Sequence, residues 1–147
     1  MQIQWIRVFV AGVLIEVVLA VVLVGGFALA GVQLQNGVST GSAIIIGASA
    51  FVAAFFVVLW FGRRITNHIV LHGFLIGVVA TLLYVVLVVG SGQMSAALAA
   101  YGPATFIAVN GARIVGAVFG GITSGRRRVV IAPRRWSREP SLRLPGQ

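Results

Sequence analysis

The chain of 147 residues contains no cysteine, lysine or aspartate, and its only acidic residues are Glu16 and Glu139. The absence of cysteine excludes disulfides, thiolate nucleophiles and thiolate metal sites. The sequence also offers no set of nucleophile, base and orienting residue, which a hydrolase would need. We therefore expect a protein that is not an enzyme and that carries no cofactor or metal.

Apolar residues dominate what is present, since hydrophobic residues make up 59% of the chain and charged residues 9%. A soluble domain with this balance would expose most of its apolar surface to water, so lipid is the expected solvent. A membrane span needs about 20 mainly apolar residues, and in lipid it must satisfy its own backbone hydrogen bonds as a helix. We predict an all-α membrane protein, a four-transmembrane-helix bundle, with spans at 8–30, 42–61, 69–90 and 103–123.

The arginines lie almost entirely outside these spans or at their edges. Arg7 precedes the first span, Arg63 and Arg64 lie between the second and the third, and seven more follow the fourth. The two remaining loops carry no charge. Because basic residues in short loops stay on the cytoplasmic side, we predict that both termini are cytoplasmic, in a multi-pass protein of a bacterial cytoplasmic membrane.

Residues Ala28 to Ala30 offer an alternative, because Ala-Leu-Ala behind a positively charged start has the form of a signal-peptidase site. Cleavage there would leave three spans. The apolar run before it is longer than the roughly 7 to 15 residues usual for a signal peptide, and it contains Glu16. We therefore expect an uncleaved first span.

Residues 126–147 form a basic tail that we separate from a transmembrane domain over 1–125. Its prolines resist a long helix, so we expect it to be disordered in solution and to lie on the bilayer surface. A docking site for a cytoplasmic protein is the alternative. Nucleic acid is not an expected partner, because only Trp136 adds an aromatic ring to the basic residues.

The net charge of +9 gathers at the cytoplasmic membrane face. Anionic headgroups attract a basic residue there by about 1 kcal/mol, so membrane lipids are the expected partners of these arginines. The arginines concerned are Arg63, Arg64, Arg126, Arg127, Arg128, Arg134 and Arg135.

Glu16 lies nine residues after Arg7, and Arg113 lies thirteen residues before Arg126. At a rise of about 1.5 Å per residue, these separations place both charges near mid-depth on the first and fourth spans. A charge at this depth costs at least about 2.5 kcal/mol and usually faces the bundle interior. Arginine keeps its proton, so Arg113 needs a partner, and Glu16 is the only acidic residue in any span. We predict an ion pair that brings the first span against the fourth.

This ion pair admits three interpretations. It is an internal staple that fixes helix register, or it is part of a proton or ion relay in which Glu16 exchanges a proton. In the relay, Asn110 or Tyr84 would continue a polar path. The third interpretation is a misjudged depth or a lipid-facing Glu16 that stays protonated.

Small residues recur at four-residue spacing along the spans, a pattern that lets helix backbones approach closely in lipid. The pattern fits contacts within the bundle as well as contacts in a homo-oligomer or with another membrane protein. The glycines that we expect at such contacts are Gly12, Gly73, Gly77, Gly116, Gly120 and Gly121.

His68 and His72 are four residues apart at the start of the third span, a spacing that presents two imidazoles on one helix face. Two ligands do not make a metal site, and a third protein ligand is hard to find in this sequence. We interpret them as ordinary interfacial histidines, with a pH sensor beside Arg63 and Arg64 as the alternative.

Three segments occur in an order that is similar to a known family: Gly62-Arg63-Arg64, then Leu71-His72-Gly73-Phe74-Leu75-Ile76-Gly77 running into Thr81-Leu82-Leu83-Tyr84, then Gly116-Ala117-Val118-Phe119-Gly120-Gly121. In this order the chain resembles the YrzE-like small bacterial membrane proteins over nearly its whole length. The resemblance implies a four-helix architecture and no established biochemical role.

The stretch from Ala11 to Val17 around Glu16 also looks somewhat like the first helix of the small multidrug resistance transporters, which have four short spans and one glutamate there. That resemblance implies proton-coupled transport. Arg113 at the same depth and the strong arginine bias, which does not fit the dual insertion of those transporters, count against it. We therefore expect a structural, assembly or accessory component that acts through helix contacts, with a small proton-coupled transporter using Glu16 as the alternative.

Overall fold

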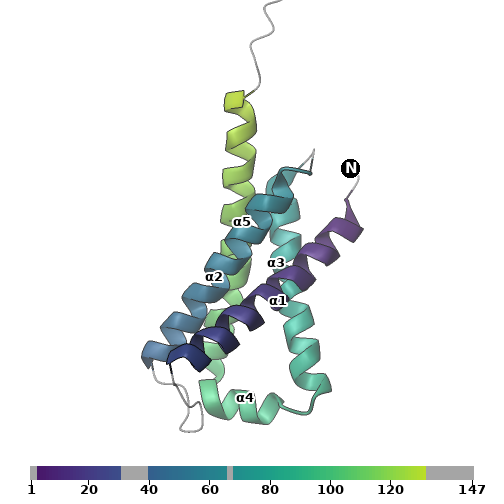
Figure 1. The fold of residues 1–147 in the computed structure, drawn as a ribbon. Coiled ribbons are helices and arrows are strands. Elements are labelled where there is room, and N and C mark those ends of the chain that lie inside the picture. The colour runs from purple at the N-terminus through teal and green to yellow at the C-terminus, as the bar shows by residue number, and fades with distance from the viewer. Residues whose placement is uncertain (1–2, 31–39, 66–67, 132–147) are drawn as a thin grey trace, which may run out of the picture.

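The computed structural model describes residues 3–30, 40–65 and 68–131, and over these residues the chain is helical without strands. Four of the helices are long and apolar enough to cross a membrane, which confirms the predicted all-α fold with four spans. Figure 1 shows the five helices in chain order: α1 (Trp5–Ala30), α2 (Thr40–Gly62), α3 (Ile69–Gly90), α4 (Met94–Tyr101) and α5 (Pro103–Ile131).

The helix bounds differ from the predicted spans mainly at α5, which continues through the arginine triplet to Ile131. We expected residues 126–147 to form a disordered tail, but the helix continues through residues 126–131. Arginine is a good helix former, and the first helix-breaking residue after the span is Pro133. The rest of the predicted tail, including Arg134 and Arg135, lies outside the described residues.

A short helix, α4, occupies most of the segment 91–102 that we expected to be a simple loop. Its sequence Met-Ser-Ala-Ala-Leu-Ala-Ala-Tyr is rich in good helix formers. Gly102, with φ at 71°, then turns the chain into Pro103, which begins α5. A positive φ favours glycine, and proline is preorganised for the first helical position, so both residues fit this corner.

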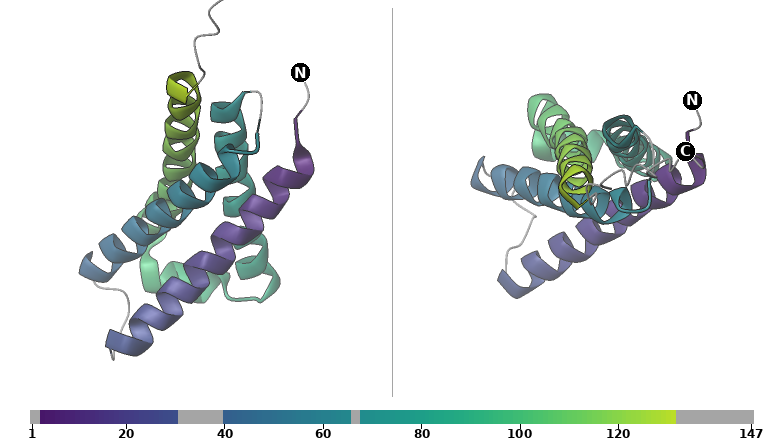
Figure 2. Two further views of the ribbon diagram at one scale, coloured as in Figure 1. Left: turned by 45° about the horizontal axis from the view of Figure 1, so that its top comes forward. Right: turned by 90° about the horizontal axis from the view of Figure 1, so that it is seen from above.

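The four long helices place all the described arginine-rich segments at one end of the bundle, which we call the arginine end (Figure 1). It comprises the start of α1, the turn from α2 to α3 and the last part of α5. The other end of the bundle, where α4 lies, is called the opposite end (Figure 1). α5 packs mainly against α2 and α3, whereas α1 crosses α2 and α3 obliquely on the other side (Figure 2).

The packing is tightest in the half of the bundle near the arginine end. One core cluster there joins α1, α2, α3 and α5, and it includes Ile65 from the turn between α2 and α3. A smaller cluster lies toward the opposite end, formed by Leu19, Ile46, Ala50 and Val109. From Ala20 to Gly26, α1 is mostly exposed. The bundle is thus closed near the arginines and more open toward α4.

All six glycines that the sequence marked for close packing lie against a neighbouring helix of the same chain. A Cβ atom at Gly73 would lie 2.6 Å from the backbone oxygen of Ala117, and one at Gly77 would lie 2.8 Å from the Cα atom of Ile114. Gly12 faces α3, Gly121 faces α3 from the other side, and Gly116 and Gly120 face the backbone of α2. Within the described bundle, these glycines are therefore used inside one protomer.

Candidate functional site: a buried ion pair reached from two helices

Glu16 of α1 and Arg113 of α5 are in contact in the interior of the bundle. Arg113 Nε lies 3.3 Å from Glu16 Oε1, and the two side chains are 3% and 14% exposed for arginine and glutamate respectively. In the low-dielectric interior of a membrane, the attraction between these charges is only weakly screened. The structure thus brings together the two charged residues that the sequence placed at mid-depth.

The guanidinium of Arg113 has two further partners. Its Nη1 atom donates a hydrogen bond to Asn110 Oδ1, one turn back on α5. Its Cζ atom lies 4.2 Å from the centroid of the Tyr84 ring on α3, a cation–π contact. Residues from three helices therefore surround a single positive charge.

Asn110 is itself held in place on both sides. Its Nδ2 atom donates to the backbone oxygen of Phe106 at 2.8 Å, so its Oδ1 atom faces Arg113 as an acceptor. The Thr81 hydroxyl of α3 donates to the backbone oxygen of Asn110 at 3.5 Å. The amide orientation is thus fixed by hydrogen bonds that leave the oxygen for the guanidinium.

The contact between Glu16 and Arg113 is close but not a well-aligned hydrogen bond. Among the described residues, Glu16 Oε1 and Arg113 Nε are the buried side-chain atoms without a hydrogen-bond partner. Their separation of 3.3 Å satisfies an ion pair, whereas the N–H direction does not point at the oxygen. The two observations are compatible, because attraction between charges depends on distance, whereas a hydrogen bond also depends on angle.

The sequence predicted that the two helices carrying the pair pack against each other. In the structure they do not. α1 packs against α3 and α2, and α5 packs against the same two helices. Gly12, on the face of α1 that carries Glu16, lies against Val79 and Ala80 of α3 rather than against α5. The prediction that the pair brings the first span against the fourth is therefore wrong. The long arginine side chain spans the gap that a helix contact was expected to close.

Two hollows adjoin the ion pair. A small cavity of about 80 Å³ is lined by Arg113, Asn110 and Tyr84 together with Tyr101 of α4. A larger groove of about 540 Å³ contains Glu16 and Arg113 at one end and Ser91 and Gln93, at the opposite end of the bundle, at the other. The ion pair is thus sealed toward the arginine end by the core and approached by a groove from the opposite end.

The two histidines do not form a metal site. His72 is 1% exposed, and its Nε2 atom accepts a hydrogen bond of 3.2 Å from the backbone N–H of Gln4. Its Nδ1 atom lies 3.0 Å from the backbone oxygen of His68. A carbonyl only accepts and an N–H only donates, so this arrangement assigns the neutral Nδ1–H tautomer to His72. Both ring nitrogens are then occupied, and His68 lies exposed at the start of α3.

Arg7 and Arg64 are exposed at the arginine end, and they connect the start of α1 with the turn after α2. Arg7 donates to the side chain of Gln4 and to the backbone oxygen of Arg64. The guanidinium carbon of Arg64 lies 5.7 Å from the ring centroid of Trp60. Arg63 and Arg126 are also exposed, whereas Arg127 and Arg128 lie within α5.

The sequence predicted for Tyr84 only a place in a polar path, and its position over the guanidinium is a contact that the pattern did not show. Thr81 was named only in the segment that carries the family resemblance, and Phe106 and Gln4 were not singled out. The available signal was the spacing of Thr81 and Tyr84, which are three residues apart on one face of α3. Gln4 and Phe106 make these contacts through backbone atoms, which the pattern of side chains in a sequence does not predict.

Comparison of the chain with family models, with curated proteins and with solved structures finds no match. In the part of the chain that the structure describes, the fold and the site are those of a helical membrane protein, with four helices long and apolar enough to span the membrane and a buried ion pair between two of them.

Proposed function

We propose that this protein is a structural, assembly or accessory component of a bacterial cytoplasmic membrane that acts through helix contacts. The observation that carries the proposal is the way α1 is held. The ion pair attaches it at mid-depth, and His72 and Arg64 attach its first turn at the arginine end. Beyond the pair, α1 is mostly exposed from Ala20 to Gly26.

The free part of α1 supports a contact role. Val21 is 67% exposed and Val24 is 71% exposed, and no atom lies within 4 Å of a Cβ placed at Gly25 or Gly26. Without a hydrophobic driving force between helices in lipid, association depends on close backbone approach, which small residues permit. A helix anchored at one end and uncovered at the other presents such a surface to a neighbouring membrane protein.

The partner test uses a photo-crosslinking amino acid at Val24 in native membranes, with Ile107 as the matched control. Ile107 is 70% exposed but lies on α5, away from the free part of α1. The proposal predicts one discrete adduct from position 24 and none from position 107. The same diffuse products from both positions would contradict it.

The second candidate, a small proton-coupled transporter, is favoured by one observation. The groove of about 540 Å³ connects Glu16 with Ser91 and Gln93, so a carboxyl group that can take up a proton lies at its inner end. In that role, Arg113 would compete with the proton for Glu16. The YrzE-like resemblance is retained as a proposal about architecture and favours neither role.

Distance measurements separate the two candidates. The chain has no cysteine, so spin labels at Val24→Cys on α1 and Val89→Cys on α3 are free of background. A staple predicts one narrow distance distribution that does not change with pH and that broadens in Glu16→Gln. Two populations that interconvert with pH in the native sequence would instead support transport.

A further inference from the structure

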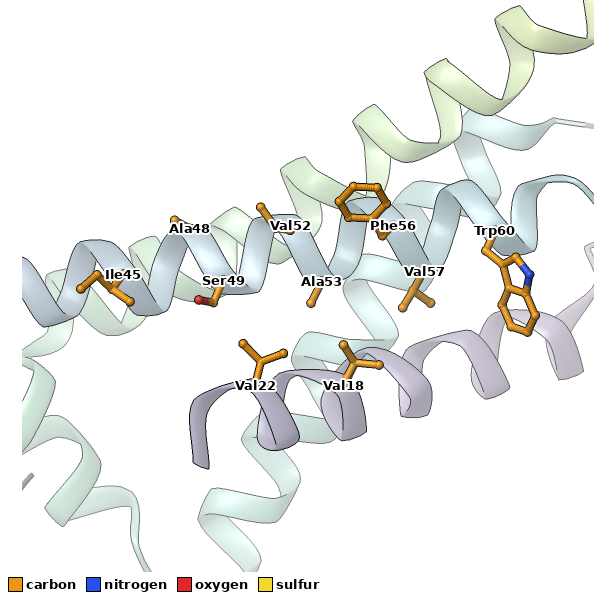
Figure 3. A pocket seen from close by; sticks show the side chains of 10 residues that line it. All are labelled: Val18, Val22, Ile45, Ala48, Ser49, Val52, Ala53, Phe56, Val57 and Trp60. Carbon is orange, nitrogen blue, oxygen red and sulfur yellow. The ribbon is translucent and has the colours of Figure 1, made fainter. Parts of the chain in front are cut away.

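A second groove lies on the lipid-facing side of the bundle, between α1 and α2, and has no connection with the ion pair. Its volume is about 560 Å³, and its walls are apolar except for the Ser49 hydroxyl and the indole nitrogen of Trp60. Figure 3 shows Val18 and Val22 of α1 on one side and the α2 side chains on the other. Trp60 lies at the end of the groove nearest the arginines.

The dimensions of this groove fit one hydrocarbon chain. Ile45 and Trp60 are 15 residues apart (60 − 45), which corresponds to about 22 Å along the helix. A volume of about 560 Å³ over that length gives a mean cross-section of about 25 Å². One leaflet of the hydrocarbon region is about 15 Å thick, so a tilted groove of this length covers the depth of one leaflet.

Positive charge lies at the same end as Trp60. The guanidinium of Arg64 lies over the Trp60 ring, and Arg7 donates to the backbone oxygen of Arg64. The only carboxylate among the described residues is Glu16, which is paired at mid-depth with Arg113. For Arg7 and Arg64, counter-charge must therefore come from outside the described bundle.

We propose that the groove between α1 and α2 is a binding site for an anionic phospholipid of the leaflet at the arginine end. One acyl chain lies in the groove between Trp60 and Ile45, and the phosphate lies at Arg64 and Arg7. The apolar walls exclude water from the chain. The two guanidiniums select the anionic headgroup, since arginine presents several N–H donors that match phosphate oxygens.

Tryptophan fluorescence in vesicles tests this site directly. The chain has three tryptophans, and the variant Trp5→Phe/Trp136→Phe retains Trp60 alone as a reporter inside the groove. The protein is reconstituted in phosphatidylcholine vesicles that contain phosphatidylglycerol or phosphatidylcholine with brominated acyl chains, because bromine quenches nearby indole. The site predicts at least about threefold stronger apparent binding of brominated phosphatidylglycerol at low mole fraction, a difference of about 0.65 kcal/mol.

Two matched variants make the test specific. Arg7→Gln/Arg64→Gln should abolish the preference for phosphatidylglycerol, and Ser49→Phe, which fills the groove, should reduce quenching by both lipids. Val115→Phe adds the same ring on an exposed face of α5 and should change neither result. A reporter at Phe119→Trp in a background with the native tryptophans replaced should show no headgroup preference, because Phe119 is exposed and does not line the groove.

Three results would overturn the proposal. Equal quenching of Trp60 by the two brominated lipids would mean ordinary surrounding lipid. An equal preference at position 119 would mean a general attraction of the basic protein surface. Quenching by both lipids that falls as protein is added at fixed lipid would mean that a helix of a second copy occupies the groove. Circular dichroism and a monodisperse elution profile establish that each variant is folded.

Discussion

Arg113 Nε lies 3.3 Å from Glu16 Oε1 although α5 and α1, the helices that carry these residues, each pack against α2 and α3 rather than against each other. The side chains therefore connect two helices whose backbones are separated by the rest of the bundle. α1 makes fewer contacts with the other helices than α2, α3 or α5 does, so it depends most on this connection.

Close helix packing predicts a large difference between two glycines on the same helix. A Cβ atom at Gly116 would overlap the backbone oxygen of Phe51, whereas nothing lies within 4 Å of one at Gly111. Gly116→Ala should destabilise the bundle by about 2 kcal/mol through overpacking. Gly111→Ala should be neutral or stabilising by up to about 1 kcal/mol, because alanine favours the helix. Unfolding in mixed micelles measures both, and equal effects would contradict the described α2–α5 contact.

The hydrogen bond from the Gln4 N–H to His72 predicts local protection of the first turn of α1. His72→Ala removes the acceptor, and a net hydrogen bond is worth about 1 kcal/mol, which is about fivefold in exchange rate. Amide hydrogen exchange at Gln4 should therefore accelerate by about this factor. His68→Ala is the control, since its side chain is exposed and only its backbone oxygen contacts His72. Equal acceleration in both variants would count against the assigned contact.

The groove that leads to the ion pair predicts a difference in water access between adjacent residues. Ala20 lines the groove, whereas Val21, the next residue, is 67% exposed and does not line it. If water fills the groove, a charged thiol reagent added from outside should modify Ala20→Cys at least about tenfold faster than Val21→Cys, because thiolate formation needs water. Labelling of the two variants in intact cells compares the rates. Equal rates would show that lipid, not water, fills the groove.

The unequal chemistry of the two charges predicts unequal costs of removing them. In Arg113→Gln the remaining carboxyl group can take up a proton and become neutral, whereas in Glu16→Gln the remaining guanidinium stays charged. Glu16→Gln should therefore cost about 2 kcal/mol and Arg113→Gln about 1 kcal/mol in unfolding free energy. Steric trapping in bicelles at neutral pH measures both values. The reverse order would mean that Arg113 finds another counter-charge.

The four spans were predictable because a run of about 20 apolar residues has few alternatives in lipid. The contact of Glu16 with Arg113 was also accessible, since each is the only residue of its charge at that depth. The helix neighbours were not, because Gly12 has the same small surface whether it faces α3 or α5. The sequence did not predict α4, because a helix of eight residues is marginal by itself and its formation depends on the segments that flank it.

The central claim is that Glu16 and Arg113 act as a structural staple, and a double-mutant cycle tests it most directly. Unfolding free energies of the native protein, Glu16→Gln, Arg113→Gln and the double variant are compared in bicelles across pH. The account predicts a coupling of about 0.5 kcal/mol or more, with little pH dependence near neutrality. Additive effects, with a stability of the native protein that changes as Glu16 titrates near neutral pH, would contradict it.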